Sequence, residues 1–134
     1  MISEKTFAFV MAGGSGERFW PMSRQSTPKH LLRLLGDETL LETTIRRLEG
    51  LIPIQNTFVL TNEAQLEATW AAVPFLPREN IIVEPAKRDT APACALATAI
   101  ARATDPDSAC LVLPADAMIH DVEKFRAQLN DAVD

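Results

Sequence analysis

Residues 7–30 read FAFVMAGGSGERFWPMSRQSTPKH, an apolar run followed by a glycine-rich loop that ends in cations. The β-branched and aromatic residues of Thr6–Met11 predict a buried strand. Gly13, Gly14 and Gly16 follow this strand, and without Cβ atoms their backbone N–H groups can approach an anion closely. Glycines alone fit a tight turn equally well, so they do not by themselves indicate a phosphate site.

Two cations near the glycines favour phosphate. Arg18 lies two residues beyond Gly16, and Lys29 follows Pro28, whose fixed φ stiffens the backbone before it. Either cation alone is typical of a solvated surface, but together with the glycines they predict a clamp for a polyphosphate. The loop is neither a Walker loop nor a dinucleotide fingerprint, because no Lys-Ser or Lys-Thr follows at the required distance and Phe19 occupies the third-glycine position.

Outside this stretch, short apolar runs alternate with helical patterns. Further strands are expected at Thr57–Thr61, Ile81–Val83 and 109–113, and helices at 40–48, 66–73, 91–103 and 122–133. Near-continuous apolar strands that alternate with helices predict a Rossmann-like, doubly wound α/β fold with a mostly parallel sheet. Ligands of such sheets bind beyond the carboxyl ends of the strands, where the glycine loop begins.

Composition and charge limit the protein class. The chain has 134 residues, 47% of them hydrophobic, which suits one domain with a substantial core. The net charge of -5 argues against a general nucleic-acid surface, and no apolar run is long enough for a membrane span or a signal peptide. Cys94 and Cys110 lack metal or redox spacing, so we expect reduced, buried thiols. We therefore expect a cytoplasmic protein that binds neither nucleic acid nor membranes.

Three segments carry a family resemblance. Residues 9–32, FVMAGGSGERFWPMSRQSTPKHLL, resemble the signature of the sugar nucleotidyltransferases, and within them the mannose-1-phosphate guanylyltransferases. EPAKRDTAPA at 84–93 and LVLPADAMI at 111–119 resemble two later motifs of the same family. The three segments occur in the family's order and extend from the first expected strand to the fourth.

The resemblance implies a reaction. GMP passes from GTP to mannose 1-phosphate, which gives GDP-mannose and pyrophosphate, with Mg²⁺ as cofactor. Both reactants are anions, so positioning and fixed positive charge should supply most of the catalysis. By resemblance Arg18 and Lys29 are the catalytic cations. The residues that would hold the nucleotide phosphates are Ala12, Gly13, Gly14, Ser15 and Gly16.

A carboxylate after the third expected strand would select the base. Guanine presents two adjacent N–H donors, which the carboxylate of Glu84 can accept together, whereas uracil and thymine flank a single ring donor with carbonyl oxygens. Asp89 stands where the family usually has Asn, and Thr90 is expected to cap the next helix. Glu84, Asp89 and Thr90 thus complete the expected nucleotide site.

Asp116 is the expected Mg²⁺ ligand by resemblance. Taken alone, it is more typical of a helix cap or a turn, but carboxylate oxygens also suit Mg²⁺. Two positions depart from the family pattern. Ala117 stands where His is usual, and His30 stands where Gln is usual. We expect only a minor role for His30, because the phosphate nucleophile is already ionised at neutral pH and needs no base.

Residues 1–134 are expected to form a single nucleotide-binding α/β domain, truncated relative to the family. The family's sugar-recognition residues and second metal carboxylate would lie beyond Asp134. The chain alone is therefore expected to bind GTP without turnover, and self-association of a full-length protein is compatible with the resemblance. Two alternatives stay open: a nucleotidyltransferase for another hexose 1-phosphate or nucleotide, and a GTP-binding module without catalysis.

Overall fold

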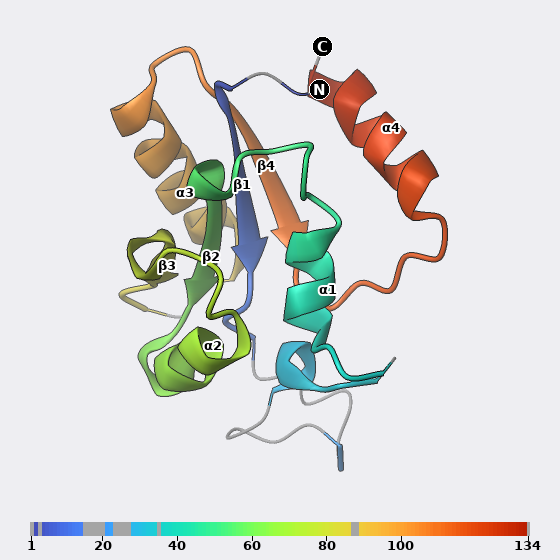
Figure 1. Ribbon diagram of the computed structural model, residues 1–134. Helices are drawn as coiled ribbons and strands as arrows, with labels where there is room; N and C mark the ends of the chain where they lie inside the picture. The colour runs from blue at the N-terminus through green and yellow to red at the C-terminus, as the bar shows by residue number, and fades with distance from the viewer. Residues whose placement is uncertain are drawn as a thin grey trace.

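Four parallel strands form a sheet in the computed structural model, which describes residues 2, 4–14, 21–22, 28–34, 36–86 and 89–133 (Figure 1). The strand order is β3-β2-β1-β4, with β1 at Thr6–Met11, β2 at Thr57–Thr61, β3 at Ile81–Val83 and β4 at Ala109–Pro114. Both β2 and β4 pair with β1, so the chain continues to opposite sides of this strand. The carboxyl ends of β1 and β4 therefore mark the topological switch point of the sheet.

Helices occupy the connections, as the alternating pattern predicts. They are α1 at Leu40–Arg46, α2 at Leu66–Ala72, α3 at Thr90–Thr104 and α4 at Val122–Val133, with 3-10 turns η2 at Lys29–Leu31, η3 at Ile54–Asn56, η4 at Glu63–Gln65 and η5 at Arg78–Asn80. Every predicted strand and helix is present within two residues of its expected limits. The Rossmann-like α/β fold is confirmed.

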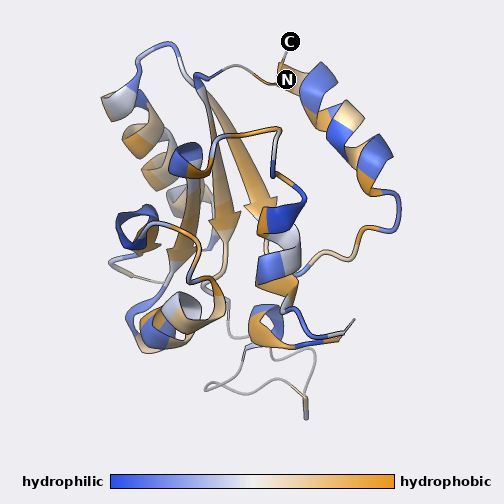
Figure 2. Ribbon diagram, in the orientation of Figure 1, coloured by the Kyte–Doolittle hydropathy of each residue, from blue (hydrophilic) through white to orange (hydrophobic). Residues whose placement is uncertain are grey.

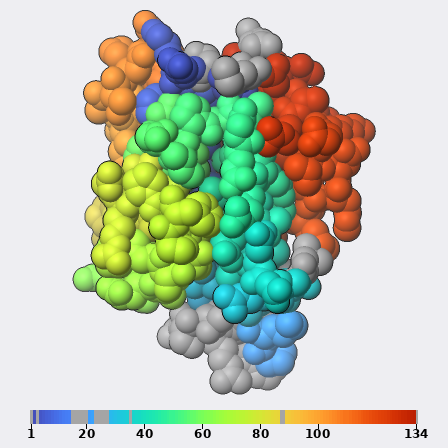
Figure 3. Space-filling model, in the orientation of Figure 1, coloured from blue at the N-terminus to red at the C-terminus, as the bar shows by residue number. Residues whose placement is uncertain are grey.

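The faces of the sheet carry different helices. Val10 and Val59 pack in a cluster with residues of α1 and α2, whereas Phe7 and Phe9 pack with the alanines of α3 on the other face. Figure 2 shows the strands as predominantly hydrophobic between helices with polar outer sides. Figure 3 shows α1 and α2 covering one face, with α4 beside α1. Small alanine side chains let α3 approach the sheet closely, which places its first turn near the strand ends.

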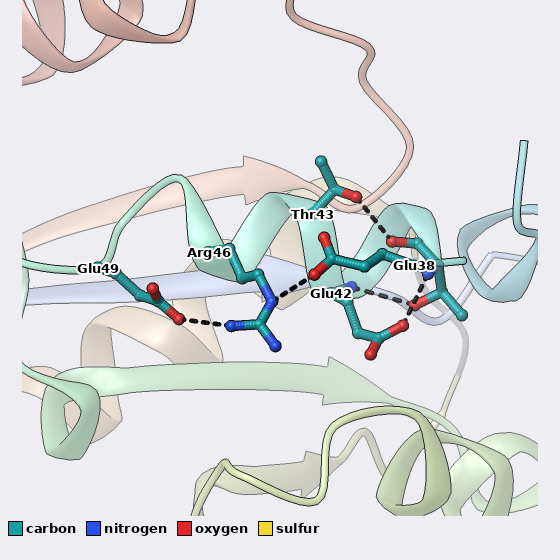
Figure 4. A network of polar contacts seen from close by, with 6 residues as sticks. Glu38, Glu42, Thr43, Arg46 and Glu49 are labelled. Carbon is teal, nitrogen blue, oxygen red and sulfur yellow. Dashed lines mark hydrogen bonds and ion pairs between the residues drawn. The ribbon is translucent and has the colours of Figure 1, made fainter. Parts of the chain in front are cut away.

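The start of α1 is fixed by a capping box. Thr39 Oγ1 accepts a hydrogen bond from the Glu42 N–H at 3.1 Å, and the Glu42 carboxylate accepts one from the Thr39 N–H at 2.7 Å (Figure 4). One turn on, Arg46 contacts Glu38 and Glu49 at 2.7 and 3.1 Å. These polar contacts keep one side of α1 in solvent and leave its apolar side for the sheet.

The expected N-cap of α3 is wrong. Thr90 is the first helical residue, and Asp89 occupies the cap position with φ 64 and ψ -155. Asp89 makes no side-chain capping hydrogen bond. The chain reverses sharply between β3 and α3, and Asp tolerates the required left-handed φ better than a β-branched Thr, so the cap falls one residue earlier.

Two further expectations have definite outcomes. Cys94 and Cys110 are free thiols, but both are half-buried rather than buried. Across the described ranges, the structure contains no helix with the length and apolar character needed to cross a bilayer.

Candidate active site

A cavity of about 370 Å³ opens at the carboxyl ends of the strands. Every strand contributes to it, either directly or through the residues that follow, and so do η2 and the first turn of α3. This is the expected ligand position for a doubly wound sheet. Its lining residues are Met11, Gly13, Gly14, Lys29, His30, Leu60, Glu84, Asp89, Thr90, Ala93, Pro114, Ala115 and Asp116.

The glycine loop leaves β1 directly above this cavity. Ala12 is buried and continues the sheet by donating its N–H to the Leu60 carbonyl at 2.7 Å. Gly13 and Gly14 then line the cavity with backbone alone. The remaining expected loop residues, Ser15, Gly16 and Arg18, lie outside the described residues.

Lys29 and Asp116 form an ion pair at the cavity wall. Lys29 comes from η2, which follows the extended Pro28 and is held to the core by Leu31. Asp116 comes from the turn after β4, where the Ala115 N–H donates to the Met11 carbonyl at 3.2 Å. The two side chains are 18% and 26% exposed, so the pair is largely withdrawn from solvent but open to the cavity. Both expected charges thus converge although 87 positions separate them in the sequence.

Glu84 reaches the glycine loop from β3. Its N–H donates to the Thr61 carbonyl at 2.8 Å, which continues the β2–β3 pairing by one residue. A Cβ placed on Gly13 would lie 3.0 Å from Glu84 Oε2, so the carboxylate occupies space that only glycine leaves open. Desolvation by burial raises the pKa of the Glu84 carboxyl above its usual value. A desolvated acceptor in a cavity is suited to recognising N–H donors of a ligand.

The sequence also matches a known family. The pattern described as nucleotidyl transferase matches residues 7–134, from within β1 to the last residue. The chain belongs to the nucleotidyl transferase family. The cavity therefore lies in a domain whose family transfers nucleotidyl groups, and it is lined by residues of all three motifs that suggested this family.

Individual relatives extend the comparison. The mannose-1-phosphate guanylyltransferase of Escherichia coli strain K12 is 44% identical over 99% of this chain, which corresponds to 28% of that protein. The alginate biosynthesis protein AlgA of Pseudomonas aeruginosa PAO1 is 39% identical over 90% of the chain and 25% of its own length. The chain thus spans little more than a quarter of the length of these curated relatives.

Solved structures agree on the fold. A crystal structure from Thermus thermophilus, described as a mannose-1-phosphate geranyltransferase, superposes with a TM-score of 0.79 and 42% identity, covering 93% of this chain and 36% of that one. A Helicobacter pylori structure described as a mannose-6-phosphate isomerase reaches a TM-score of 0.73 at 18% identity, over 96% of this chain and 45% of its own. The second likeness concerns the fold alone.

His30 is more central to this nucleotidyl transferase site than its sequence context predicts. It lines the cavity, its side chain is 2% exposed, and its Nε2 has no hydrogen-bond partner in the described part of the chain. Desolvation lowers its pKa to about 4, with Lys29 contributing in the same direction and Asp116 opposing it. His30 is therefore neutral at physiological pH and presents an unpaired ring nitrogen.

Asn62 and Gln65 are site residues that the sequence reasoning missed. Their side-chain amides donate to the carbonyls of Gly13 and Gly14 at 3.1 and 3.4 Å. Neither residue belongs to a recognised motif, and both follow β2 rather than β1. Only their position just after an expected strand indicates that they lie at the ligand-binding end of the parallel sheet.

The donor set for a metal is small. Among the residues that the structure describes, no three His, Cys, Asp or Glu side chains are grouped to hold an ion. Asp116 nevertheless offers one carboxylate at the cavity wall, and Mg²⁺ commonly binds one or two protein carboxylates together with substrate phosphates and water. This donor set fits Mg²⁺ delivered with a nucleotide and does not fit a metal held by protein alone.

Proposed function

We propose that the protein transfers GMP from GTP to mannose 1-phosphate, releasing pyrophosphate and forming GDP-mannose in the cytoplasm, and that residues 1–134 are its nucleotide-binding domain. The observation that carries the proposal is the convergence of Glu84, the Gly13–Gly14 backbone and the Lys29–Asp116 pair on one cavity. The 44% identity to a mannose-1-phosphate guanylyltransferase supports the choice of nucleotide and sugar.

Guanine binds toward Glu84. Its N1–H and N2 amino group form a double donor for the carboxylate, whereas a pyrimidine places an oxygen next to its ring N–H. Asp89 and Thr90 line the same part of the cavity at the start of α3. The partial desolvation of Glu84 strengthens this recognition, because a hydrogen bond to a charged acceptor is stronger where water competes less.

The triphosphate binds along the glycine loop. The loop backbone from Gly13 onward supplies N–H donors, while Ala12, whose N–H is bonded to the Leu60 carbonyl, holds the start of the loop in the sheet, and we assign Ser15, Gly16 and Arg18 to the same cradle. Arg18 and Lys29 then face the charge that develops on the departing pyrophosphate. Fixed cations placed in advance of the reaction stabilise this charge without reorganising solvent.

The bond changes are those of a simple displacement. A phosphate oxygen of mannose 1-phosphate bonds to the α-phosphorus of GTP, and the bond from that phosphorus to the oxygen bridging the β-phosphate breaks. The electron pair leaves with pyrophosphate. Mannose 1-phosphate is already ionised, so the chain needs no general base, and the neutral His30 is consistent with this.

Lys29 and Asp116 form an ion pair with each other before the ligands bind. In the complex Lys29 turns to a phosphate oxygen, and Asp116 is the residue that would hold Mg²⁺. Bound there, the ion would neutralise phosphate charge as a Lewis acid. The ion pair thus keeps both groups aligned and their charges compensated in the partly desolvated cavity until substrate replaces each partner.

A product assay tests the proposal. The full-length protein is incubated with GTP, Mg²⁺ and either mannose 1-phosphate, glucose 1-phosphate or galactose 1-phosphate, and pyrophosphate and GDP-sugar are measured. We expect pyrophosphate to be released at least ten times faster with mannose 1-phosphate than with either of the other sugar phosphates. Equal rates with glucose 1-phosphate would indicate a nucleotidyltransferase for another hexose, and GTP binding without any product would indicate a binding module.

A further inference from the structure

Three consecutive carbonyls of the glycine loop are held by side chains that follow one another at the end of β2. Thr61 Oγ1 donates to the Ala12 carbonyl at 3.4 Å. Asn62 Nδ2 donates to Gly13 at 3.1 Å, and Gln65 Nε2 to Gly14 at 3.4 Å. The backbone of the loop is therefore oriented by side chains from a neighbouring strand and not by its own turn alone.

These contacts fix the direction of the loop amides. In a trans peptide unit the N–H points opposite to the carbonyl of the preceding residue. Thr61 and Gln65 lie on the α2 side of the sheet, where Thr61 contacts Thr69. The cavity is lined by Thr90 and Ala93 of α3 and also by Lys29 and His30 of η2. Through the carbonyls of Ala12 and Gly13, Thr61 and Asn62 therefore fix the opposite-pointing N–H groups of Gly13 and Gly14, two residues that line the cavity.

The Asn62 side chain and the backbone of Gln65 are themselves held by hydrogen bonds. Asn62 Oδ1 accepts the Gln65 N–H at 3.0 Å, which caps η4, and the Gln65 carbonyl accepts Thr69 Oγ1 at 2.8 Å. Thr69 is buried, and Gln65 is only 5% exposed. The donors to the loop thus have little freedom, so the loop is oriented before a ligand arrives.

Burying the Gln65 side chain is energetically unfavourable for its carbonyl oxygen, so the residue is not explained by a contribution to the stability of the fold. Its Oε1 is buried and accepts no hydrogen bond from the described residues. A buried acceptor without a donor is less favourable than an apolar side chain of the same shape. Methionine would fill this position without the unpaired oxygen, so the amide indicates a role other than stabilising the fold.

We propose that Asn62 and Gln65 are positioning residues for the nucleotide phosphates, acting through the peptide units that begin with the Gly13 and Gly14 carbonyls. This inference rests on the proposed function, because it assumes that the phosphates bind at the glycine loop. The side chains touch the loop carbonyls and not the ligand. Their effect is to aim backbone donors at the phosphates in advance, which lowers the cost of ordering the loop on binding.

The test compares a nucleotide with its nucleoside. Asn62→Asp keeps the oxygen that caps η4 but cannot donate to Gly13, and Gln65→Met removes the other donor without adding charge. Ala64→Asp is the matched control, because residue 64 is exposed on the same turn and the substitution adds the same charge without replacing Asn62 or Gln65. Dissociation constants for GTP and for guanosine are measured by calorimetry on the full-length protein, together with each melting temperature.

We expect Asn62→Asp and Gln65→Met each to weaken GTP about tenfold and guanosine less than twofold, while Ala64→Asp changes GTP less than threefold. Gln65→Met should melt no lower than the unmodified protein. Equal weakening of GTP and guanosine, or no change in either, would overturn the positioning role while leaving the proposed function intact. Failure of the unmodified protein to bind GTP would instead overturn the proposed function, and this inference with it.

Discussion

The Glu84 carboxylate lies against Gly13, with Oε2 3.0 Å from the position that a Cβ on Gly13 would occupy. The contact joins the loop after β1 to the residue after β3 across the intervening strand β2. Gly13 is thus required for a close approach between backbone and a side chain. The carboxylate proposed to read the base and the loop proposed to bind the phosphates are in this way parts of one cavity.

Replacing Gly13 with Ala should displace Glu84. A Cβ contact of 3.0 Å is too tight, and the tip of the Glu84 side chain yields more easily than the sheet. We expect Gly13→Ala to fold normally and to weaken GTP about tenfold in a calorimetric titration. Gly14→Ala is the control, because its Cβ would meet no atom within 4 Å. Equal losses from both variants would mean that the methyl group obstructs the ligand and not Glu84.

Glu84→Gln should lower the selectivity for GTP over UTP without lowering the stability of the fold. Because burial raises the pKa of Glu84, the charged carboxylate is less favourable in the folded state than in the unfolded one. The folded-state cost grows as pH rises through the usual carboxyl range, and the uncharged amide removes it. At pH 7 we expect a melting temperature equal to or above that of the unmodified protein, with kcat/KM for GTP over UTP reduced at least tenfold. Unchanged selectivity would exclude Glu84 as the base reader.

Lys29→Ala should remove a catalytic charge without unfolding the domain. Losing a fixed cation that faces developing negative charge costs about 2 to 4 kcal/mol, or roughly two to three orders of magnitude in kcat. The melting temperature should change little, because the Lys29–Asp116 pair keeps access to the cavity. Lys124→Ala on the exposed side of α4 is the control for charge alone. Turnover within threefold of normal for Lys29→Ala would reject the clamp.

Asp116→Asn separates metal binding from a turn role. As a Mg²⁺ ligand, Asp116 should make GTP binding respond to Mg²⁺, and the amide should reduce this response at least tenfold while the melting temperature is nearly unchanged. Titrations of GTP at several Mg²⁺ concentrations measure it, with Asp131→Asn on α4 as the exposed control. A lower melting temperature with an unchanged response to Mg²⁺ would favour the cap or turn interpretation.

His30 should make the domain less stable in acid. The folded state holds the ring neutral down to a pKa of about 4, whereas the unfolded chain takes up a proton below 6.5. Stability is therefore full above pH 6.5 and falls as pH decreases toward 4, by up to roughly 3 kcal/mol from this residue. Urea unfolding at pH 7 and pH 4.5 should show a smaller decrease for His30→Gln than for the exposed control His120→Gln. Identical decreases in both variants would contradict the assignment.

The strands and helices could be predicted from the sequence because the patterns that specify them lie within short segments. Apolar runs such as Thr6–Met11 and the helical faces between them predict the elements, and their alternation predicts a parallel α/β sheet but not its strand order. Motifs named Lys29 and Asp116 as candidate site residues, and the structure pairs them at the wall of one cavity, whereas their roles stay predictions. Asn62 and Gln65 were missed because their contacts depend on which strand lies beside β1, and the N-cap of α3 was wrongly placed at Thr90 because the backbone angle at Asp89 decides the cap.

The central claim is that the cavity at the β1–β4 switch point is a guanine nucleotide site, and a calorimetric comparison of GTP with UTP tests it most directly. Both nucleotides are titrated into the unmodified full-length protein with and without Mg²⁺. The arrangement of Glu84, the glycine loop and Asp116 predicts that GTP binds at least tenfold more tightly than UTP and that Mg²⁺ strengthens GTP binding. Equal affinities for the two nucleotides, or no binding of either, would contradict it.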